Sequence, residues 1–234
     1  MTTPGWLSRC LADVPPGEGW LGPVERGVLR TLRTERRRSD WRLGRWTAKL
    51  AVGAWMSVAP ESVEIVAAAD GAPEAWLDGR RLPASVSISH RAGRALAAVG
   101  GTGALVGCDL ELVEPRSDAF VREWLRQAES EMLAARPQGE RALMANLLWT
   151  AKEAAAKVRR EGLRLDLRNA VVVQAAETAL DGEWRALSVR WEDGSRPTSA
   201  WTRAEATFVM SIAAEPAPDS PRELSWAGGG RAPR

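Results

Sequence analysis

The chain has 234 residues, of which 45% are hydrophobic and 26% charged, and a formal net charge of +2 at pH 7. This balance is typical of a soluble globular protein with enough apolar material for one large core or two smaller ones. A charge so near zero argues against a protein that binds nucleic acid through its overall charge. No uncharged apolar run approaches the length that crosses a bilayer.

The cysteine content and the first residues predict a cytoplasmic protein. Cys10 and Cys108 are too few for a disulfide framework, which favours a reducing compartment. Residues 1–5 have neither the basic nor the apolar region of a signal peptide.

The first arginine-rich segment predicts two helices. Residues 1–22 are rich in proline and glycine and predict loops with at most a short strand around Trp6 and Leu7, and a helix is expected to begin near Pro23. A second helix is predicted over residues 39–55, where Arg45 and Lys49 lie i, i+4 apart and share a face. The arginines crowded between residues 33 and 45 either form a solvated face or bind an anionic ligand.

The middle of the chain predicts strands that lead to the only histidine. Residues 84–91 alternate as a strand that ends at His90, between Ser89 and Arg91. These side chains are hydrogen-bond donors suited to phosphate oxygens, although a lone histidine is more often structural. Residues 95–99 and 106–112 are predicted to pair as a hairpin, which would bring Ser89 close to the next strand.

That next strand carries two acidic residues. Asp109 and Glu111 point to one face because side chains alternate along a strand, and Cys108 and Leu110 point to the other. Two neighbouring carboxylates repel each other unless a cation lies between them, and Mg²⁺ prefers oxygen ligands. Taken alone, the pattern more often marks a solvated face.

The second half predicts an amphipathic helix over residues 119–135 and a long helix over residues 140–160. On the long helix Trp149, Glu153 and Lys157 share one face at i, i+4 and i+8. Such a Glu–Lys pair is usually a surface pair. Beside a two-carboxylate strand, however, it could assemble a metal site with an adjacent phosphate-binding cation. Strands are predicted at residues 170–174, 184–191 and 206–213.

The two segments together resemble a known family. Residues 107–111 (Gly-Cys-Asp-Leu-Glu) and, about forty residues later, residues 149–157 (Trp-Thr-Ala-Lys-Glu-Ala-Ala-Ala-Lys) resemble the paired signature of the 4'-phosphopantetheinyl transferases. The length resembles the larger, surfactin-synthetase-type subfamily, a single chain of two similar halves. The resemblance implies an α+β fold of two similar α/β halves with pseudo-twofold symmetry. The expected units are an N-terminal half (1–108), a C-terminal half (109–214) and a disordered tail (215–234).

The resemblance also implies roles for individual residues. The expected ligands of coenzyme A are Arg45 and, second to it, Lys49 on the early helix, Ser89 and His90 in an S-x-S-H motif, the adjacent Arg91, and Lys157. The expected ligands of Mg²⁺, with Mn²⁺ as an alternative, are Asp109, Glu111 and Glu153. The expected catalytic residues are Glu153, Lys157 and Asp109, and whether Glu153 binds the metal or acts as the general base is left open.

Three further segments match less well. Residues 71–73 (Gly-Ala-Pro) resemble a G-(K/R)-P loop beside the adenine, but Ala72 stands where a basic residue is common. Residues 159–163 resemble a G-x-G-L segment without its first glycine. Glu129 resembles the glutamate of another family element, although a surface glutamate is the simpler interpretation.

The predicted reaction is transfer of the 4'-phosphopantetheine arm of coenzyme A to a serine of an acyl or peptidyl carrier protein. The carrier is expected to dock between the halves, near residues 119–135. A monomer with no nucleic-acid or membrane partner is expected. The alternatives are a Mg²⁺-dependent phosphohydrolase that uses the same carboxylates and an arginine-rich nucleic-acid-binding protein.

Overall fold

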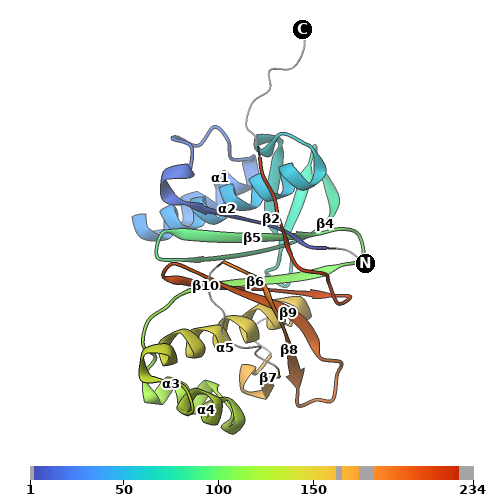
Figure 1. Ribbon diagram of the computed structural model, residues 1–234. Coiled ribbons are helices and arrows are strands. Elements are labelled where there is room, and N and C mark those ends of the chain that lie inside the picture. Colours follow the sequence, from blue (N-terminus) through green and yellow to red (C-terminus); the bar gives the residue numbers. More distant parts are fainter. Residues whose placement is uncertain (1–2, 162–164, 174–181, 227–234) are drawn as a thin grey trace.

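The computed structural model describes residues 3–161, 165–173 and 182–226. The fold is mixed α+β, as predicted, and contains two sheets and two helices of 22 residues, one for each half of the chain (Figure 1). The two sheets lie between the two long helices, so that the molecule is layered from helix to sheet to sheet to helix. Among the described residues, no helix is both long and apolar enough to span a membrane.

The N-terminal half is built on a six-stranded sheet in the order β11-β1-β5-β4-β3-β2. Thr34 caps the long helix through the Arg37 amide, and the helix ends at Ser57 in the left-handed conformation. The elements of this half are β1 (Gly5–Cys10), η1 (Leu11–Asp13), α1 (Pro23–Thr31), α2 (Glu35–Met56), η2 (Pro60–Ser62), β2 (Val63–Ala67), β3 (Pro73–Leu77), β4 (Arg80–Arg91) and β5 (Arg94–Gly100).

The C-terminal half is built on a five-stranded antiparallel sheet in the order β6-β10-β9-β8-β7. The predicted long helix over residues 140–160 is confirmed as α5. The elements of this half are β6 (Leu105–Leu112), α3 (Asp118–Trp124), α4 (Gln127–Ala134), α5 (Gln138–Arg159), η4 (Leu167–Asn169), β7 (Ala170–Val173), β8 (Arg185–Trp191), β9 (Thr198–Glu205) and β10 (Phe208–Glu215).

The two halves repeat one architecture. Without β11, the strand order β1-β5-β4-β3-β2 matches β6-β10-β9-β8-β7 element for element in chain order. In each half the long helix precedes a short 3-10 helix and the edge strand, β2 or β7. The same tetrapeptide, Trp-Thr-Ala-Lys, occurs at residues 46–49 of α2 and 149–152 of α5. The expectation of two similar α/β halves is therefore met in the structure, and this tetrapeptide is a repeat that the sequence analysis missed.

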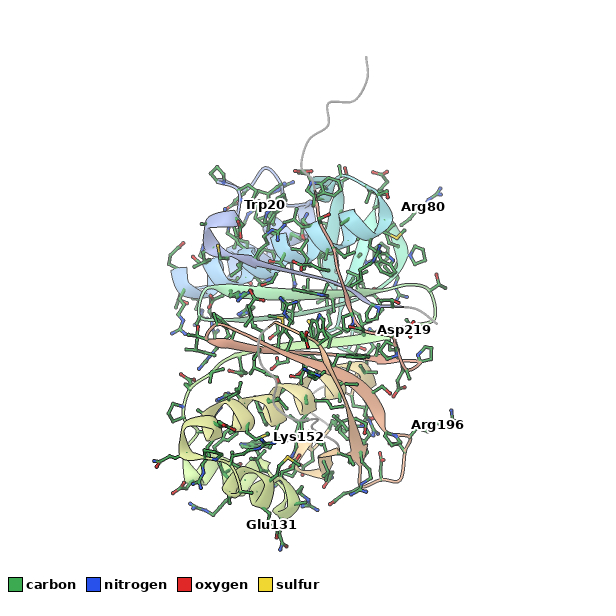
Figure 2. All side chains as sticks on the ribbon, viewed as in Figure 1. Trp20, Arg80, Glu131, Lys152, Arg196 and Asp219 are labelled. Carbon is green, nitrogen blue, oxygen red and sulfur yellow. The ribbon has the colours of Figure 1, made fainter. Side chains whose placement is uncertain are left out.

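The repeated lysine forms a buried ion pair in each half. Lys49 lies 2.7 Å from Glu25, and Lys152 lies 2.6 Å from Glu129, with all four side chains fully buried. Figure 2 shows Lys152 inside the C-terminal half. Each glutamate also closes the first turn of a short helix, α1 or α4, by accepting from its N-cap amide, and accepts from an edge strand, from the amides of Ile65 and Val172 respectively. Because removal of one partner leaves a buried charge, each pair fixes the position of its long helix.

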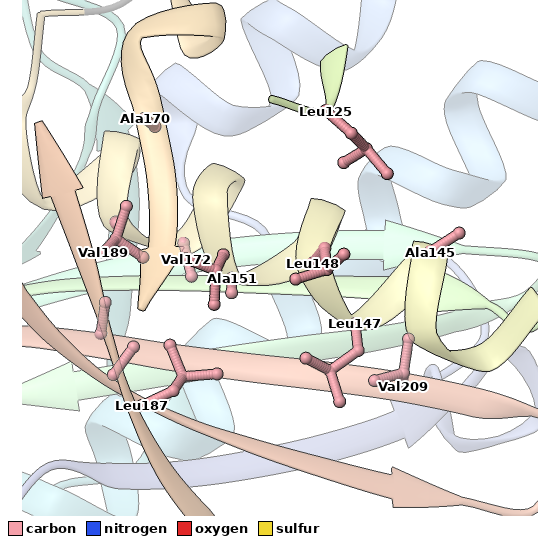
Figure 3. Close-up of a cluster of buried hydrophobic side chains, with 14 of the residues drawn as sticks. Leu125, Ala145, Leu147, Leu148, Ala151, Ala170, Val172, Leu187, Val189 and Val209 are labelled. Carbon is pink, nitrogen blue, oxygen red and sulfur yellow. The ribbon is translucent and has the colours of Figure 1, made fainter. Parts of the chain in front are cut away.

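Three apolar clusters hold these layers together. One lies between α2 and the six-stranded sheet, and another between α5 and the five-stranded sheet (Figure 3). The third joins the two sheets and includes Trp6, Leu96, Cys108, Leu110 and Ile212. Since burial of apolar area is the main stabilising contribution, the third cluster makes the two halves one packed unit.

Two sequence predictions about the fold are wrong. Strands β5 and β6 do not form a hairpin, because β5 pairs with β1 and β4 while β6 pairs with β10 in the other sheet. The helix predicted over residues 119–135 is divided into α3 and α4 at Leu125, which is buried with an extended backbone. The chain changes direction at Leu125 to bury its side chain, and the amphipathic pattern did not indicate this break between the two helices.

The expected unit boundaries also need correction. The boundary at residue 108 falls inside β6, a strand that belongs entirely to the C-terminal sheet. Part of the tail expected to be disordered pairs with β1 as β11 (Arg222–Glu223), and Leu224 is buried beneath Gly5. The chain therefore returns to the N-terminal sheet after β10. Residues 162–164, 174 and 227–234, to which other expectations applied, lie outside the described residues.

Candidate active site

A cavity of about 1510 Å³ lies between the halves. Its lining includes residues of α2, the loop before β3, strand β4 and α5, together with Leu165–Arg168. Pockets for compact ligands usually measure about 300–1000 Å³, so this cavity suits a long ligand or two ligands that meet. Of the predicted site residues, Arg45, His90, Glu153 and Lys157 line it.

A glycine determines how closely α5 approaches the acidic strand. A Cβ atom on Gly107 would lie 2.0 Å from the backbone oxygen of Ala154, so only glycine fits here. This close packing lets Lys157 Nζ donate to the Cys108 carbonyl at 2.8 Å and to Asp109 Oδ1 at 2.9 Å. The predicted meeting of the strand and the helix is thus observed.

Asp109 is the centre of the polar contacts. Its Oδ1 also accepts from Ser89 Oγ at 2.9 Å, while its Oδ2 is buried and has no hydrogen-bond partner among the described residues. Burial lowers the pKa of Lys157, but the charge of Asp109 and its hydrogen bond outweigh burial, so that the pKa is raised overall. Lys157 is therefore protonated at neutral pH.

Glu111 faces two arginines. Its Oε2 lies 3.1 Å from Arg116 Nη2 and 3.5 Å from Arg91 Nε. Burial and then repulsion by Asp109 raise the pKa of Glu111, and the two arginines oppose that rise. Arg91, predicted to bind the cofactor, is thus directed at acidic side chains and does not line the cavity.

Glu153 is the carboxylate that lines the cavity beside Lys157. It forms no hydrogen bond or ion pair with the described residues. Burial raises its pKa, and repulsion by Asp109 and Glu111 adds to the rise, while Lys157 opposes it. A carboxylate with a raised pKa is a better proton acceptor near neutral pH, and such groups are common in active sites.

The three predicted metal ligands suit a hard cation by their chemistry but not by their present arrangement. Asp109 Oδ2 is a buried oxygen without a hydrogen-bond donor among the described residues, whereas Glu111 Oε2 is paired with Arg116, and both carboxylates belong to the same face of β6. Within the part of the chain that the structure describes, however, no three His, Cys, Asp or Glu side chains are grouped so that they could hold a metal ion. Protein cations are bound to these carboxylates instead.

Arg45 and His90 also line the cavity. The Arg45 guanidinium lies 4.9 Å from the Trp41 ring, and its buried Nε has no hydrogen-bond partner in the described chain. Burial lowers the pKa of Arg45, although Glu25 opposes this, which marks a desolvated cation without a close counter-ion. Gly44 allows α2 to pack against β4 beside His90, since a Cβ there would lie 3.2 Å from Ile88.

Lys49 is not part of the site. Its ammonium donates to the carbonyls of Trp20 and Val63 and pairs with Glu25, all inside the N-terminal core. The prediction that Lys49 binds the cofactor is therefore wrong. The i, i+4 spacing correctly places Lys49 one turn after Arg45 on α2. The spacing alone does not show that the Lys49 side chain turns into the core while Arg45 faces the cavity.

Serine side chains join the two halves and bring Ser89 to Asp109. The hydroxyls of Ser85, Ser87 and Ser89 accept from three alternate amides of β6, at 3.1, 3.0 and 3.3 Å. Ser89 thus reaches Asp109 as predicted, but through β4 crossing β6 and not through a hairpin. The alternation Ser-x-Ser-x-Ser was the signal for this contact, and the sequence analysis used only its last member.

A further ion pair connects the halves across the cavity wall. Arg160, the left-handed C-cap of α5, binds both carboxylate oxygens of Asp70 at 2.9 and 3.0 Å, and both residues line the cavity. Asp70 belongs to the loop that contains Ala72. The sequence analysis gave neither residue a role, because the pair joins positions ninety apart.

These features define an α+β protein with an acidic and basic site between two similar halves. Residues 105–196 match the family model described as the 4'-phosphopantetheinyl transferase superfamily. The matched segment includes the acidic strand and the helix with Glu153 and Lys157, so the predicted resemblance is supported at the level of the superfamily.

Comparison with solved structures finds the crystal structure of Thermotoga maritima holo-[acyl-carrier-protein] synthase. The sequences are 23% identical, the TM-score is 0.35, and the match covers 54% of this chain and 76% of that chain. No curated protein matches the chain.

Proposed function

We propose that this protein transfers the 4'-phosphopantetheine arm of coenzyme A to a serine of an acyl or peptidyl carrier protein. The observation that carries the proposal is the convergence of Ser89 and Asp109 on Lys157, which lines a cavity together with Arg45 and Glu153. The superfamily match over residues 105–196 supports the reaction class. The larger, surfactin-synthetase-type subfamily is supported by the chain length and the two similar halves.

Coenzyme A would lie along the cavity, with its nucleotide toward α2. Arg45, whose buried Nε has no partner in the described part of the chain, and His90 would bind the 3'-phosphate. The Trp41 ring beside Arg45 offers an apolar wall to the nucleoside. Lys157 would bind the pyrophosphate, since its raised pKa keeps the ammonium charged and it already lies at the acidic strand.

Glu153 is proposed as the general base. The carrier serine hydroxyl has a high pKa and must lose its proton as its oxygen bonds to phosphorus. The bond from that phosphorus to the phosphate retained by the nucleotide breaks, and adenosine 3',5'-bisphosphate leaves. Glu153 lines the cavity, has no competing hydrogen bond from the described residues, and has a raised pKa caused by burial and by Asp109 and Glu111. Burial raises the pKa of Cys108 to about 11, so this thiol stays protonated and no covalent step uses it.

Mg²⁺, or Mn²⁺, is proposed as the metal, with Asp109, Glu111 and Glu153 as its protein ligands. When bound, the ion would polarise a phosphoryl oxygen and offset charge on the leaving group. Asp109 Oδ2, which has no donor among the described residues, supports this assignment. If the metal uses Asp109 and Glu111, Glu153 stays free for proton transfer.

The test is intact-protein mass spectrometry of apo carrier proteins incubated with this protein, coenzyme A and Mg²⁺. The expected result is a mass gain of one phosphopantetheine that disappears without metal and with Asp109→Ala. Asp118→Ala, an exposed residue of α3, is the matched control and should keep full activity. Absence of both transfer and coenzyme A binding with fatty-acid, polyketide and peptide carriers would contradict the proposal and favour a phosphohydrolase.

A further inference from the structure

A bidentate ion pair joins the two halves at the cavity. The guanidinium of Arg160 donates to both carboxylate oxygens of Asp70, at 2.9 and 3.0 Å, and both residues line the cavity. Asp70 lies between β2 and β3 in the N-terminal half, and Arg160 is the C-cap of α5 in the C-terminal half. Because two parallel N–H donors fix direction as well as distance, the pair holds these two parts of the cavity lining in one relative position.

On the N-terminal side the ion pair holds a tight, exposed turn. The Gly71 amide donates to the Ala68 carbonyl at 2.9 Å, and the Ala68 amide donates to the Ala72 carbonyl at 2.8 Å. Asp70 Oδ1 accepts from the Ala72 amide at 3.1 Å in addition to its bond from Arg160. Gly71, with φ 85°, supplies the left-handed backbone that the turn requires. One carboxylate therefore closes the turn and also fastens it to the opposite half, and Asp70, Gly71 and Ala72 all line the cavity.

The backbone at position 160 does not require an arginine. Arg160 ends α5 in the left-handed conformation with φ 56°, and Ser57 ends α2 in the same way with φ 58°. The two caps are counterparts, since they are as far apart along the chain as the two copies of the Trp-Thr-Ala-Lys repeat. Glycine is the residue that this conformation favours, so arginine gains nothing there from its backbone. What distinguishes Arg160 from Ser57 is a side chain that reaches Asp70.

From these observations we propose that Arg160 is a positioning residue for the nucleotide of coenzyme A, acting from the opposite half of the molecule. The inference rests on the proposed function. Through Asp70, Arg160 holds the turn that ends at Ala72 in the place where it contacts the nucleotide. Lys157, proposed to bind the pyrophosphate, precedes Arg160 by three positions at the end of α5. Without the ion pair the exposed turn must be ordered when the ligand binds, and that ordering lowers affinity.

Two single substitutions break the ion pair and preserve the local backbone. Asp70→Asn keeps the side-chain oxygen that accepts from the Ala72 amide and removes the charge that pairs with Arg160. Arg160→Gly removes the guanidinium and leaves a residue that suits the left-handed conformation. Ser57→Gly is the matched control, because it makes the same backbone change in the equivalent cap of α2. Ser57 is exposed and is not among the described residues that line the cavity.

Isothermal titration calorimetry with coenzyme A and with adenosine 3',5'-bisphosphate, which carries the nucleotide without the arm, measures the effect. We expect Asp70→Asn and Arg160→Gly each to weaken the binding of both ligands by the same factor, about 3–10-fold. The double variant should bind no more weakly than either single variant, because both substitutions remove one contact. In the transfer assay the KM for coenzyme A should rise while kcat stays nearly unchanged. The thermal midpoint of Arg160→Gly should not fall, and Ser57→Gly should match the wild type in every binding and kinetic measurement.

The outcomes separate this inference from the proposed function. If the wild type transfers phosphopantetheine and Arg160→Gly binds both ligands as tightly as the wild type, the inference is wrong and the proposed function stands. A lower thermal midpoint and a lower kcat at an unchanged KM would also overturn the inference, since the ion pair would then be only structural. If the wild type neither transfers phosphopantetheine nor binds coenzyme A, the proposed function itself fails.

Discussion

Lys157 and Asp109 meet where α5 packs on β6, with Nζ 2.9 Å from Oδ1, while Oδ2 of the same carboxylate is buried without a donor from residues 3–161, 165–173 and 182–226. One oxygen of Asp109 is therefore used by the protein and the other is not. Buried carboxylate oxygens usually have hydrogen-bond partners, so an unpaired one beside Lys157, which lines the cavity between the halves, is characteristic of a binding site.

Replacing Lys157 tests how much of this contact is structural. Lys157→Met should lower transfer by about 10²–10³-fold, as expected for the loss of a cation at a developing charge. It should also lower the free energy of unfolding by about 1–3 kcal/mol, because Asp109 is left buried and unpaired. Urea denaturation and the mass-spectrometric assay measure the two effects. Adding Asp109→Asn to Lys157→Met should restore stability but not activity, and recovery of activity would exclude an electrostatic role for this pair.

The contact between the acidic strand and α5 depends on Gly107. Gly107→Ala should destabilise the protein by about 3 kcal/mol or more, because the new Cβ would lie 2.0 Å from a backbone oxygen that cannot move alone. Gly139→Ala is the matched control, since a Cβ there has nothing within 4 Å and alanine favours the first turn of α5. We expect it to raise stability by up to about 1 kcal/mol. Equal thermal midpoints for the two variants would contradict the packing described here.

Much of the site was predictable, and most of the pairing between distant segments was not. The acidic strand and the helix with Glu153 and Lys157 follow from local periodicity, which their own residues carry. The pairing of β6 with β10 joins residues about one hundred positions apart, and a nearby glycine-rich turn suggested the wrong partner. Lys49 shows the same limit, because its ion pair with Glu25 comes from another helix. A direct comparison of the two halves would have predicted it, since the Trp-Thr-Ala-Lys repeat places Lys49 and Lys152 in one structural role.

The corrected role of Lys49 leads to a contrast with Arg45. Lys49→Met should lower the free energy of unfolding by about 3–5 kcal/mol, because Glu25 is left as an uncompensated buried charge. Lys152→Met should do the same in the other half. Arg45→Ala should leave stability nearly unchanged, as its guanidinium is desolvated and has no ion-pair partner in the described chain. Differential scanning fluorimetry distinguishes these outcomes, and a stable Lys49→Met would refute the structural role.

Arg45 also gives a test of ligand orientation. If it binds the 3'-phosphate, Arg45→Ala should weaken coenzyme A binding about 10–100-fold, the range for a hydrogen-bonded charge pair. Binding of dephospho-coenzyme A, which lacks that phosphate, should change little. Isothermal titration calorimetry of both ligands with both proteins completes the cycle. If Arg45→Ala weakens the binding of both ligands equally, Arg45 does not contact the 3'-phosphate of coenzyme A.

In the metal-free protein, Glu153 is expected to lower stability while it supports transfer. Burial and then repulsion by Asp109 raise the pKa of Glu153 in the folded state above its unfolded value. As the pH rises through the interval between the two pKa values, the unfolded state loses its proton first. The free energy of unfolding therefore falls, and this loss of stability persists at neutral pH.

Glu153→Gln should therefore abolish transfer and yet raise the thermal midpoint at pH 7 by about 2–4 °C, the change that 1 kcal/mol produces in a chain of this size. At a pH below the unfolded-state pKa of this glutamate, where it is protonated in both states, the two proteins should have the same thermal midpoint. Glu140→Gln, on the exposed start of α5, should match the wild type throughout. A lower midpoint for Glu153→Gln at pH 7 would mean that Glu153 is held by favourable contacts and is not a strained, available base.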